Sequence, residues 1–239
     1  MDTAKPLAGK VSMVTGASRG IGFAVAQALA RLGSDVAICA RDAERLAAAG
    51  RELERQGVRV FTARVDVRRA ADVNSFVETA QKTLGEIDIA VNNAGVGVFV
   101  PGHQATEEQW NTVLDTNLKS VFLVCRAVAP SMIRRKTGHI INVASLAGKN
   151  AFAGGALYCA SKWGLLGFTQ SLAEDLRSYG IRVSAVCPGT VATEFSPHAG
   201  KDPSKMLQPE DVAHAVETIV TQAPQSFISE ILLRPTQKP

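Results

Sequence analysis

A tyrosine and a lysine stand four residues apart, at Tyr158 and Lys162, in a segment whose apolar residues have helical spacing. Four residues make about one turn of helix, so the two side chains project from the same face. The residues predicted on that inward face are Tyr158, Lys162, Leu165, Leu166, Thr169 and Leu176. A lysine on an inward face usually has a function, although its ammonium can also reach the surface along an extended stem.

This pair of residues suits proton transfer to or from oxygen. Reduction of a carbonyl by hydride leaves an alkoxide that needs a proton, and a tyrosine with a pKa of about 10 is a poor acid or base at neutral pH. A nearby ammonium stabilises the phenolate, so we expect Lys162 to lower the pKa of Tyr158. Ser145 follows a predicted strand and could hydrogen-bond the substrate oxygen beside the phenol, although serine is also common in turns.

Asn117 is a polar residue on a predicted apolar helix face. Thr106 and Gln109 form the pattern of a capping box that opens this helix. Its predicted inward stripe contains Trp110, Val113, Leu114, Asn117, Val121 and Val128. A buried amide needs hydrogen-bond partners, so Asn117 belongs either to a reactive site or to a purely structural contact.

A glycine-rich turn follows the first predicted strand, over residues 11–15, and leads directly into an amphipathic helix. The turn contains Gly16, Ser18, Arg19, Gly20, Ile21 and Gly22. Glycines here allow a pyrophosphate to approach the helix N-terminus, where free amides and the helix dipole favour an anion. The alternative is a connecting loop without a ligand, but a strand before and a helix after it favour dinucleotide binding.

The end of the second predicted strand indicates which dinucleotide would bind. An acid in that position holds the ribose 2′-hydroxyl of NAD, but this chain has Ala40 followed by Arg41. Arg41 and Arg19 could meet on a 2′-phosphate, so we predict NADP(H) as the cofactor. The alternative for Arg41 is an exposed residue at the start of a helix.

The elements that would position these residues alternate between short β-branched runs and helical patterns. Strands are predicted at residues 11–15, 35–40, 59–65, 87–92, 139–144, 182–187 and 227–233. Alternation of this kind predicts an α/β fold with a parallel sheet covered by helices on both faces. We expect one domain over residues 1–239, with a substrate loop at about 189–209, where glycine, proline and serine replace clear periodicity.

The chain resembles the short-chain dehydrogenase/reductase family. The motifs that recur in the order and spacing of that family are residues 15–22, 92–95, Asn117, Ser145, Tyr158 with Lys162, and Pro188 with Gly189. The resemblance covers nearly the whole chain, and the complete set of motifs is highly specific. It implies a Rossmann-type, doubly wound sheet of seven parallel strands and an enzyme that interconverts a carbonyl and its alcohol.

The resemblance also implies a role for each residue of the site. Tyr158 would be the acid/base, Ser145 would orient the carbonyl, Lys162 would also bind the nicotinamide ribose, and Asn117 would hold a water molecule in a proton relay. Further cofactor contacts are implied for Asp66 and Val67 at the adenine, for Asn93, Ala94 and Gly95 in the cleft, and for Pro188, Gly189, Val191 and Thr193 at the nicotinamide.

Much of the chain is similar to 3-oxoacyl-carrier-protein reductases, which makes that activity the main alternative. Those reductases dock an acidic carrier protein with arginines on two long helices, whereas the matching positions here are Pro130 and Glu174. The tail at 229–235 instead resembles reductases of small hydroxy acids, semialdehydes and other carbonyls. Candidate pocket residues point to an apolar ketone or aldehyde: Val96, Val98, Phe99, Leu146, Phe152, Phe195, Met206 and Leu207.

Composition narrows the remaining classes of function. The net charge of +4 comes from dispersed basic residues, so we expect no nucleic-acid partner, and we interpret Arg68 and Arg69 as a solvated helix end. No apolar run reaches the length of a membrane span, and the four separated cysteines suggest neither a metal site nor disulfides. We therefore expect a cytoplasmic homodimer or homotetramer, with a non-catalytic dinucleotide-binding regulator as a further alternative.

Overall fold

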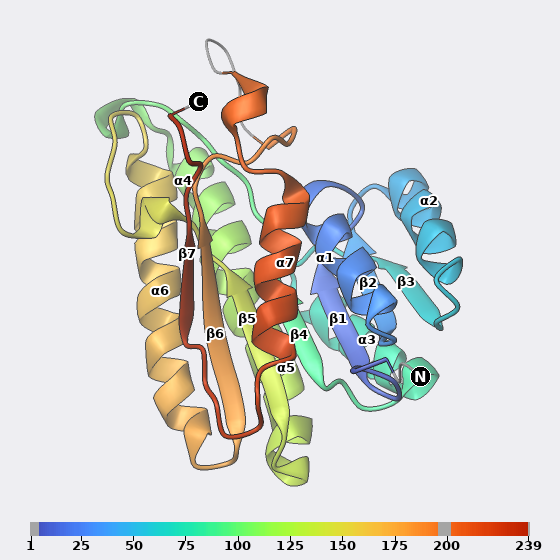
Figure 1. The fold of residues 1–239 in the computed structure, drawn as a ribbon. Coiled ribbons are helices and arrows are strands. Elements are labelled where there is room, and N and C mark those ends of the chain that lie inside the picture. The colour runs from blue at the N-terminus through green and yellow to red at the C-terminus, as the bar shows by residue number, and fades with distance from the viewer. Residues whose placement is uncertain (1–4, 196–201, 239) are drawn as a thin grey trace.

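The computed structural model describes residues 5–195 and 202–238. Seven strands form one sheet in the order β3-β2-β1-β4-β5-β6-β7, and all neighbouring pairs are parallel (Figure 1). The strands are β1 (Val11–Thr15), β2 (Asp35–Ala40), β3 (Val60–Arg64), β4 (Ile89–Asn92), β5 (Gly138–Val143), β6 (Ile181–Pro188) and β7 (Glu230–Leu233). The predicted doubly wound parallel sheet is confirmed.

Several strands are shorter than predicted. The strands expected at 59–65, 87–92 and 227–233 begin later in the chain, at Val60, Ile89 and Glu230. Ile87 and Phe227 are apolar because they pack into or against the core, not because they belong to the sheet. The predicted strands were too long because buried apolar residues that precede the strands have the same residue types as the strands themselves.

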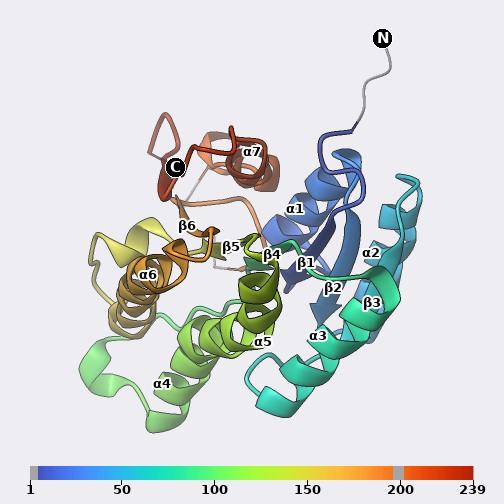
Figure 2. The same cartoon turned by 90° about the horizontal axis from the view of Figure 1, so that it is seen from below.

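Helices cover both faces of the sheet (Figure 2). One face carries α1 (Gly20–Arg31), α2 (Ala43–Glu54) and α7 (Pro209–Val220), and the other carries α3 (Ala70–Leu84), α5 (Ser120–Arg135) and α6 (Ala156–Arg177). Because the central strands are covered on both sides, β1 and β4 are buried along their whole length. Within the described residues, none of the helices is long and apolar enough to cross a membrane.

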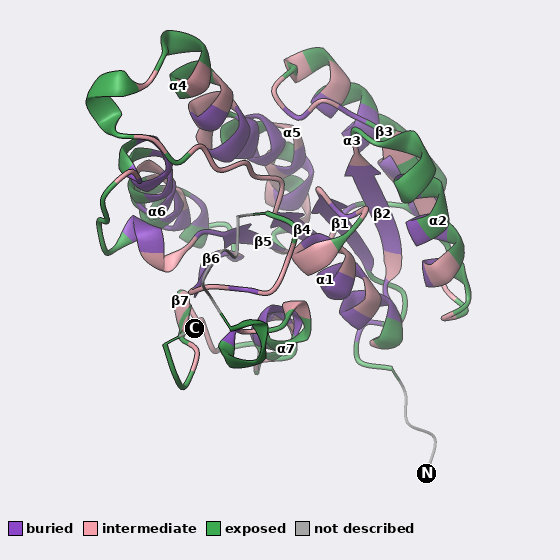
Figure 3. Cartoon of the chain, turned by 90° about the horizontal axis from the view of Figure 1, so that it is seen from above, coloured by how far each residue is buried: buried purple, intermediate pink, exposed green. Residues whose placement is uncertain are grey.

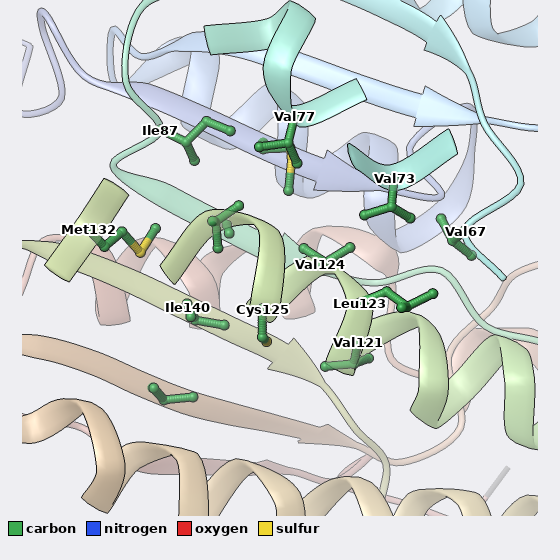
Figure 4. Packing of buried hydrophobic residues seen from close by; sticks show 14 of the residues in the cluster. Val67, Val73, Val77, Ile87, Val121, Leu123, Val124, Cys125, Met132 and Ile140 are labelled. Atoms are coloured by element: carbon green, nitrogen blue, oxygen red, sulfur yellow. The ribbon is translucent and has the colours of Figure 1, made fainter. Parts of the chain in front are cut away.

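Two apolar layers separate the sheet from its helices. Figure 4 shows the layer that contains Val73 and Val77 of α3 together with Val121 and Val124 of α5. All four cysteines are buried and unpaired, and Cys125 belongs to this layer. Figure 3 shows the same division from above, with buried strands inside and exposed surfaces on the outer helices.

The helix predicted to begin after Thr106 is interrupted. The capping box of Thr106 and Gln109 opens α4 (Glu107–Leu114), but a π-helix, Asp115–Lys119, then leads into α5. A π-helix has hydrogen bonds that span five residues instead of four, so it rotates the faces of the helices on either side of it. The prediction that Trp110 points inward is wrong, since its surface is 47% exposed. α4 has only eight residues and buries Val113 alone, so Trp110 lies on its solvent side, whereas Asn117 within the π-helix is buried.

The glycine turn after β1 is fastened to the loop after β4. The Thr15 hydroxyl accepts hydrogen bonds from the backbone N–H groups of Asn93 and Ala94, each at 3.1 Å. The Asn93 amide donates to the carbonyls of Thr15 and Gly16, at 3.0 and 3.1 Å. Gly16 has a φ of +66°, and a Cβ there would lie 2.8 Å from Ala94 Cα. The two loops therefore depend on each other for their shape.

We predict that Gly22→Ala destabilises the protein. A Cβ at Gly22 would lie 2.3 Å from Asn93 Nδ2 and 2.5 Å from the Gly16 carbonyl oxygen, so both loops must shift. Overpacking of this kind lowers the free energy of unfolding by about 1–3 kcal/mol.

Thermal and urea unfolding measure this effect, with Gly167→Ala as the matched control. Gly167 lies in α6, and a Cβ at this position would have no atom within 4 Å, so alanine there should raise stability by about 0.5–1 kcal/mol. Equal stability of Gly22→Ala and wild type would contradict the proposed fastening of the loops.

Candidate active site

A cavity of about 930 Å³ opens at the carboxyl ends of the strands. The sheet order reverses between β1 and β4, because the chain runs from β1 outward to β3 and then returns to β4 on the other side. Loops that leave two such strands diverge and create a crevice between them. Figure 3 views the molecule from this end.

Nearly all of the residues predicted from the sequence line this one cavity. They are Gly16, Ser18, Arg19, Gly20, Ile21, Arg41, Asp66, Val67, Asn93, Ala94, Gly95, Ser145, Tyr158, Lys162, Pro188, Gly189, Val191 and Thr193. Gly22 and Asn117 are the predicted residues that do not line it. Gly22 instead allows the close approach of Asn93 and the glycine turn.

Tyr158 lies in the first turn of α6 and is buried. Burial raises the pKa of Tyr158 to about 12, although a hydrogen bond with Ser145 acts in the opposite direction. The Lys162 ammonium lies 5.8 Å from the centre of the tyrosine ring. The net pKa of Tyr158 is therefore raised in the protein by itself, because the loss of water around the phenol outweighs the other effects. The lowering of this pKa by Lys162 stays a prediction.

Lys162 is buried one turn further along α6. Its Nζ donates a 2.9 Å hydrogen bond to the Val143 carbonyl at the end of β5. Burial lowers the pKa of Lys162 to about 8, because the charged form loses its hydration. The alternative in which the ammonium reaches the surface is excluded, since Lys162 is only 5% exposed.

Ser145 has two roles: its side chain caps a short helix, and it also interacts with the Tyr158 phenol. Its hydroxyl oxygen accepts a 3.1 Å hydrogen bond from the Ala147 N–H and so caps the short 3₁₀ helix Leu146–Gly148. The hydroxyl also hydrogen-bonds Tyr158. The turn thus fixes the serine next to the phenol at the edge of the cavity.

Asn117 holds a loop and a helix together. Its Oδ1 accepts from the Val96 N–H at 2.8 Å, and its Nδ2 donates to the Val96 carbonyl at 2.9 Å and to Ser161 Oγ at 3.0 Å. The side-chain amide therefore joins the loop after β4 to α6, three residues beyond Tyr158. This contact is the structural one considered from the sequence, and a role in a proton relay stays a prediction.

Four arginines line the cavity where the loops after β1, β2 and β3 meet, a part that we call the wide end. Two of them, Arg19 and Arg41, were predicted from the sequence. Arg45, in the first turn of α2, stands one turn after Arg41, a spacing that could have revealed it. The interpretation of Arg68 as a solvated helix end is wrong, because its guanidinium folds back onto Asp66, with Nη2 2.6 Å from Oδ2. This contact lowers the pKa of Asp66 to about 2.

A carboxylate that was not predicted from the sequence also faces these arginines. Glu194 lies in the loop after β6, and its Oε2 accepts hydrogen bonds from Arg19 and Arg45, the latter at 3.2 Å. Glu194 lies 175 residues after Arg19 and 149 after Arg45, so no local pattern could have paired them.

Two phenylalanine rings pack on the Tyr158 ring, and a third packs on one of them. Phe99 and Phe195 each lie with ring centres 5.6 Å from that of Tyr158, and Phe152 lies 6.1 Å from Phe99. All three are more than a third exposed, as expected for a site that receives an apolar ligand. Of the predicted pocket residues, Val96 and Phe195 line the cavity. The others do not: Met206 and Leu207 are core packing residues, and Val98, Phe99, Leu146 and Phe152 lie outside its lining. Part of the predicted substrate loop, residues 196–201, lies outside the described residues.

Comparison with known proteins agrees with this arrangement. Residues 10–204 match the family model for short chain dehydrogenases. A metagenomic short-chain oxidoreductase, solved in complex with NADP, is 44% identical and superposes with a TM-score of 0.87, covering 98% of this chain and 100% of that one.

Two further relatives carry named activities. A putative ketoacyl reductase of granaticin polyketide synthase from Streptomyces violaceoruber is 43% identical over 78% of this chain and 69% of its own. A 3-oxoacyl-[acyl-carrier-protein] reductase from Synechocystis is 35% identical over 93% of this chain and 94% of its own. From the family match, the fold and these identities, we conclude that the chain belongs to the short-chain dehydrogenase family of oxidoreductases.

Proposed function

We propose that this protein is an NADP(H)-dependent oxidoreductase that interconverts a ketone or aldehyde and its alcohol. The observation that carries the proposal is the placement of Tyr158, hydrogen-bonded with Ser145, in the same cavity as Lys162 and the glycine turn. A proton donor for a carbonyl oxygen thus shares one cleft with a cradle for a dinucleotide.

The residues of the cavity fit NADP(H). Gly16 allows a pyrophosphate to approach the N-terminus of α1, where backbone N–H groups and the helix dipole favour an anion. At the wide end, Arg19 and Arg41 supply cations for a 2′-phosphate, and Ala40 stands where an NAD site would have an acid. We assign the adenine end to Asp66 and Val67 and the nicotinamide end to Pro188, Gly189, Val191 and Thr193.

The bound cofactor would supply hydride to the substrate carbon or accept it in the reverse direction. With a pKa of about 12, Tyr158 carries its proton at neutral pH and can donate it to the substrate oxygen. Ser145 orients that oxygen, and the positive charge of Lys162 stabilises the phenolate that forms. Asn117 fixes the Val96 loop beside them.

We propose an apolar carbonyl compound as the substrate. The walls next to Tyr158 are the rings of Phe99 and Phe195, and the charged groups of the cavity other than Lys162 lie among the arginines and their partners at the wide end. An apolar group would displace water from these rings on binding.

Reduction of a 3-oxoacyl group on a carrier protein is the second candidate. It is supported by the relatives named for that activity. Against it stand Pro130 and Glu174, which are both exposed on α5 and α6 at the positions where carrier-docking arginines were expected. A proline and an acid offer no cation to an acidic partner, so a free carbonyl compound is our first choice.

We propose a homodimer or homotetramer located in the cytoplasm. A groove between α5 and α6 is lined by Leu118, Phe122 and Phe168, and Trp163 beside it is 54% exposed. Exposed apolar surface of this kind is typical of an interface. Buried, unpaired cysteines agree with a reducing compartment.

We predict that Tyr158→Phe lowers the rate of carbonyl reduction by about 100- to 10,000-fold, because it removes the proton donor. The measurement is NADPH absorbance against a panel of aliphatic and aryl ketones and aldehydes, with NADPH affinity measured separately. Tyr179→Phe is the matched control, since Tyr179 is the other tyrosine and is exposed just beyond the far end of α6. A Tyr158→Phe variant as fast as wild type would remove Tyr158 from the mechanism, and a wild type without turnover would favour the non-catalytic regulator.

Arg41→Asp is predicted to weaken NADPH binding by about ten- to hundredfold and to leave NADH binding much less affected, because only NADPH has the 2′-phosphate. Fluorescence titration with both dinucleotides measures this difference. Arg51→Asp makes the same charge change on an exposed position of α2 that does not line the cavity. Equal losses for NADPH and NADH in Arg41→Asp would overturn the assignment.

Sedimentation equilibrium should give the mass of a dimer or tetramer for the wild type. Phe122→Glu places a charge in the apolar groove and is expected to shift the protein towards monomer. A monomeric wild type at micromolar concentration would contradict the proposed assembly.

A further inference from the structure

Glu194 connects the two walls of the cavity at its wide end. Arg19 belongs to the glycine turn after β1, and Arg45 belongs to α2, which follows β2. Both guanidinium groups bind the same oxygen, Oε2 of Glu194, which comes from the loop after β6. All three residues line the cavity.

The acids that line the wide end differ in what holds them. Asp66 is bound by Arg68 two residues away, and Asp42 caps α2 by accepting a hydrogen bond from the Arg45 N–H at 3.0 Å. Those contacts are local and form within their own loops. Glu194, in contrast, reaches the arginines from a distant part of the chain, so its contact depends on where the loop after β6 lies.

Two converging guanidinium groups bind a phosphate as readily as a carboxylate, because both anions present paired oxygens to the planar donors. We propose that Glu194 is a specificity-determining residue, an internal competitor that binds the Arg19 and Arg45 pair in place of the 2′-phosphate of NADP(H). This inference rests on the proposed function, because it assumes that the 2′-phosphate binds at this end of the cavity.

The exchange is feasible because the pairs involving Glu194 are weak. The side chains of Arg19, Arg45 and Glu194 are 52%, 48% and 65% exposed, and ion pairs at such positions contribute little stability. A phosphate monoester carries about −1.5 to −2 charge at neutral pH, compared with −1 for a carboxylate, so the 2′-phosphate can displace Glu194 from the arginines. NAD(H) has no such group, and its binding does not require the displacement.

The residue after Glu194 lies at the other end of the cavity, next to Tyr158. Phe195, the next residue, packs on the Tyr158 ring and lies 4.0 Å from the position of a Cβ on Gly95. Glu194 and Phe195 are adjacent, so the residue that binds the arginines is joined directly to a residue that packs on the phenol ring.

Titration of Glu194→Gln with NADPH and with NADH tests the inference. Removal of the competing charge should tighten NADPH binding by about three- to tenfold and leave NADH binding unchanged. Adenosine 2′,5′-bisphosphate, which carries the 2′-phosphate without the nicotinamide, should show the same gain. Glu174→Gln is the matched control, because Glu174 forms a similarly exposed pair with Arg177 outside the cavity.

A double-mutant cycle adds a second measurement. Arg45→Gln alone should weaken NADPH binding, and in that background Glu194→Gln should give a smaller gain, because one of its two partners is gone. Unchanged NADPH affinity in Glu194→Gln, or equal gains for NADPH and NADH, would overturn the inference while leaving the proposed function intact. A wild type that binds neither dinucleotide would overturn both.

Discussion

The burial of one ammonium group, that of Lys162, is the constraint around which the active end of the cavity is built. Removal from water lowers its pKa to about 8, compared with about 10.4 in an unfolded chain. Between these values the unfolded chain binds more protons than the folded one, so stability increases as the pH rises from about 8 to about 10.4. At neutral pH, therefore, the folded protein retains a charge that costs it stability. A site that must stabilise a phenolate has a use for that charge, whereas a purely structural position would be better filled by an apolar residue.

The surrounding fold holds this charge with polar contacts that join the strands to α6. The Asn92 amide donates to Asn142 at 2.9 Å, the Asn142 amide donates to Thr169 at 2.9 Å, and Thr169 donates to the Leu165 carbonyl. This buried chain of hydrogen bonds links β4, β5 and α6. Because it fixes α6 along β5, the Lys162 ammonium meets the Val143 carbonyl, and Tyr158 meets Ser145. The register of one helix on one strand thus determines where the Tyr158 phenol and the Lys162 ammonium lie in the cavity.

The features that follow from periodic residue patterns could be predicted from the sequence. The shared face of Tyr158 and Lys162 follows from helical periodicity, and the crevice follows from strands that alternate with helices. The orientation of Trp110 could not be predicted, because α4 is a short helix that buries only Val113, and the π-helix that ends it has no clear signal in the residue types. The pKa of Tyr158 was also beyond reach, since it depends on burial among rings from loops after β4 and β6. Contacts such as that of Glu194 with Arg45 join residues that only the finished fold brings together.

The loop after β6 contacts both ends of the cavity, and the two ends differ in their exposure to water. At the wide end the arginines are exposed, and water screens each charge, so contacts there form and break at little cost. At the reactive end Tyr158 and Lys162 are buried, and water is excluded, so each charge has a large effect. Residues 188–195 run between these ends, from the buried end of β6 to the exposed Glu194 and Phe195. A segment of regular sheet could not make both kinds of contact, because its hydrogen-bond ladder would fix it in one position. The loop is anchored at Pro188 and again where the Ala192 N–H bonds the Leu207 carbonyl, and beyond these contacts Glu194 faces the arginines and Phe195 packs on the phenol ring.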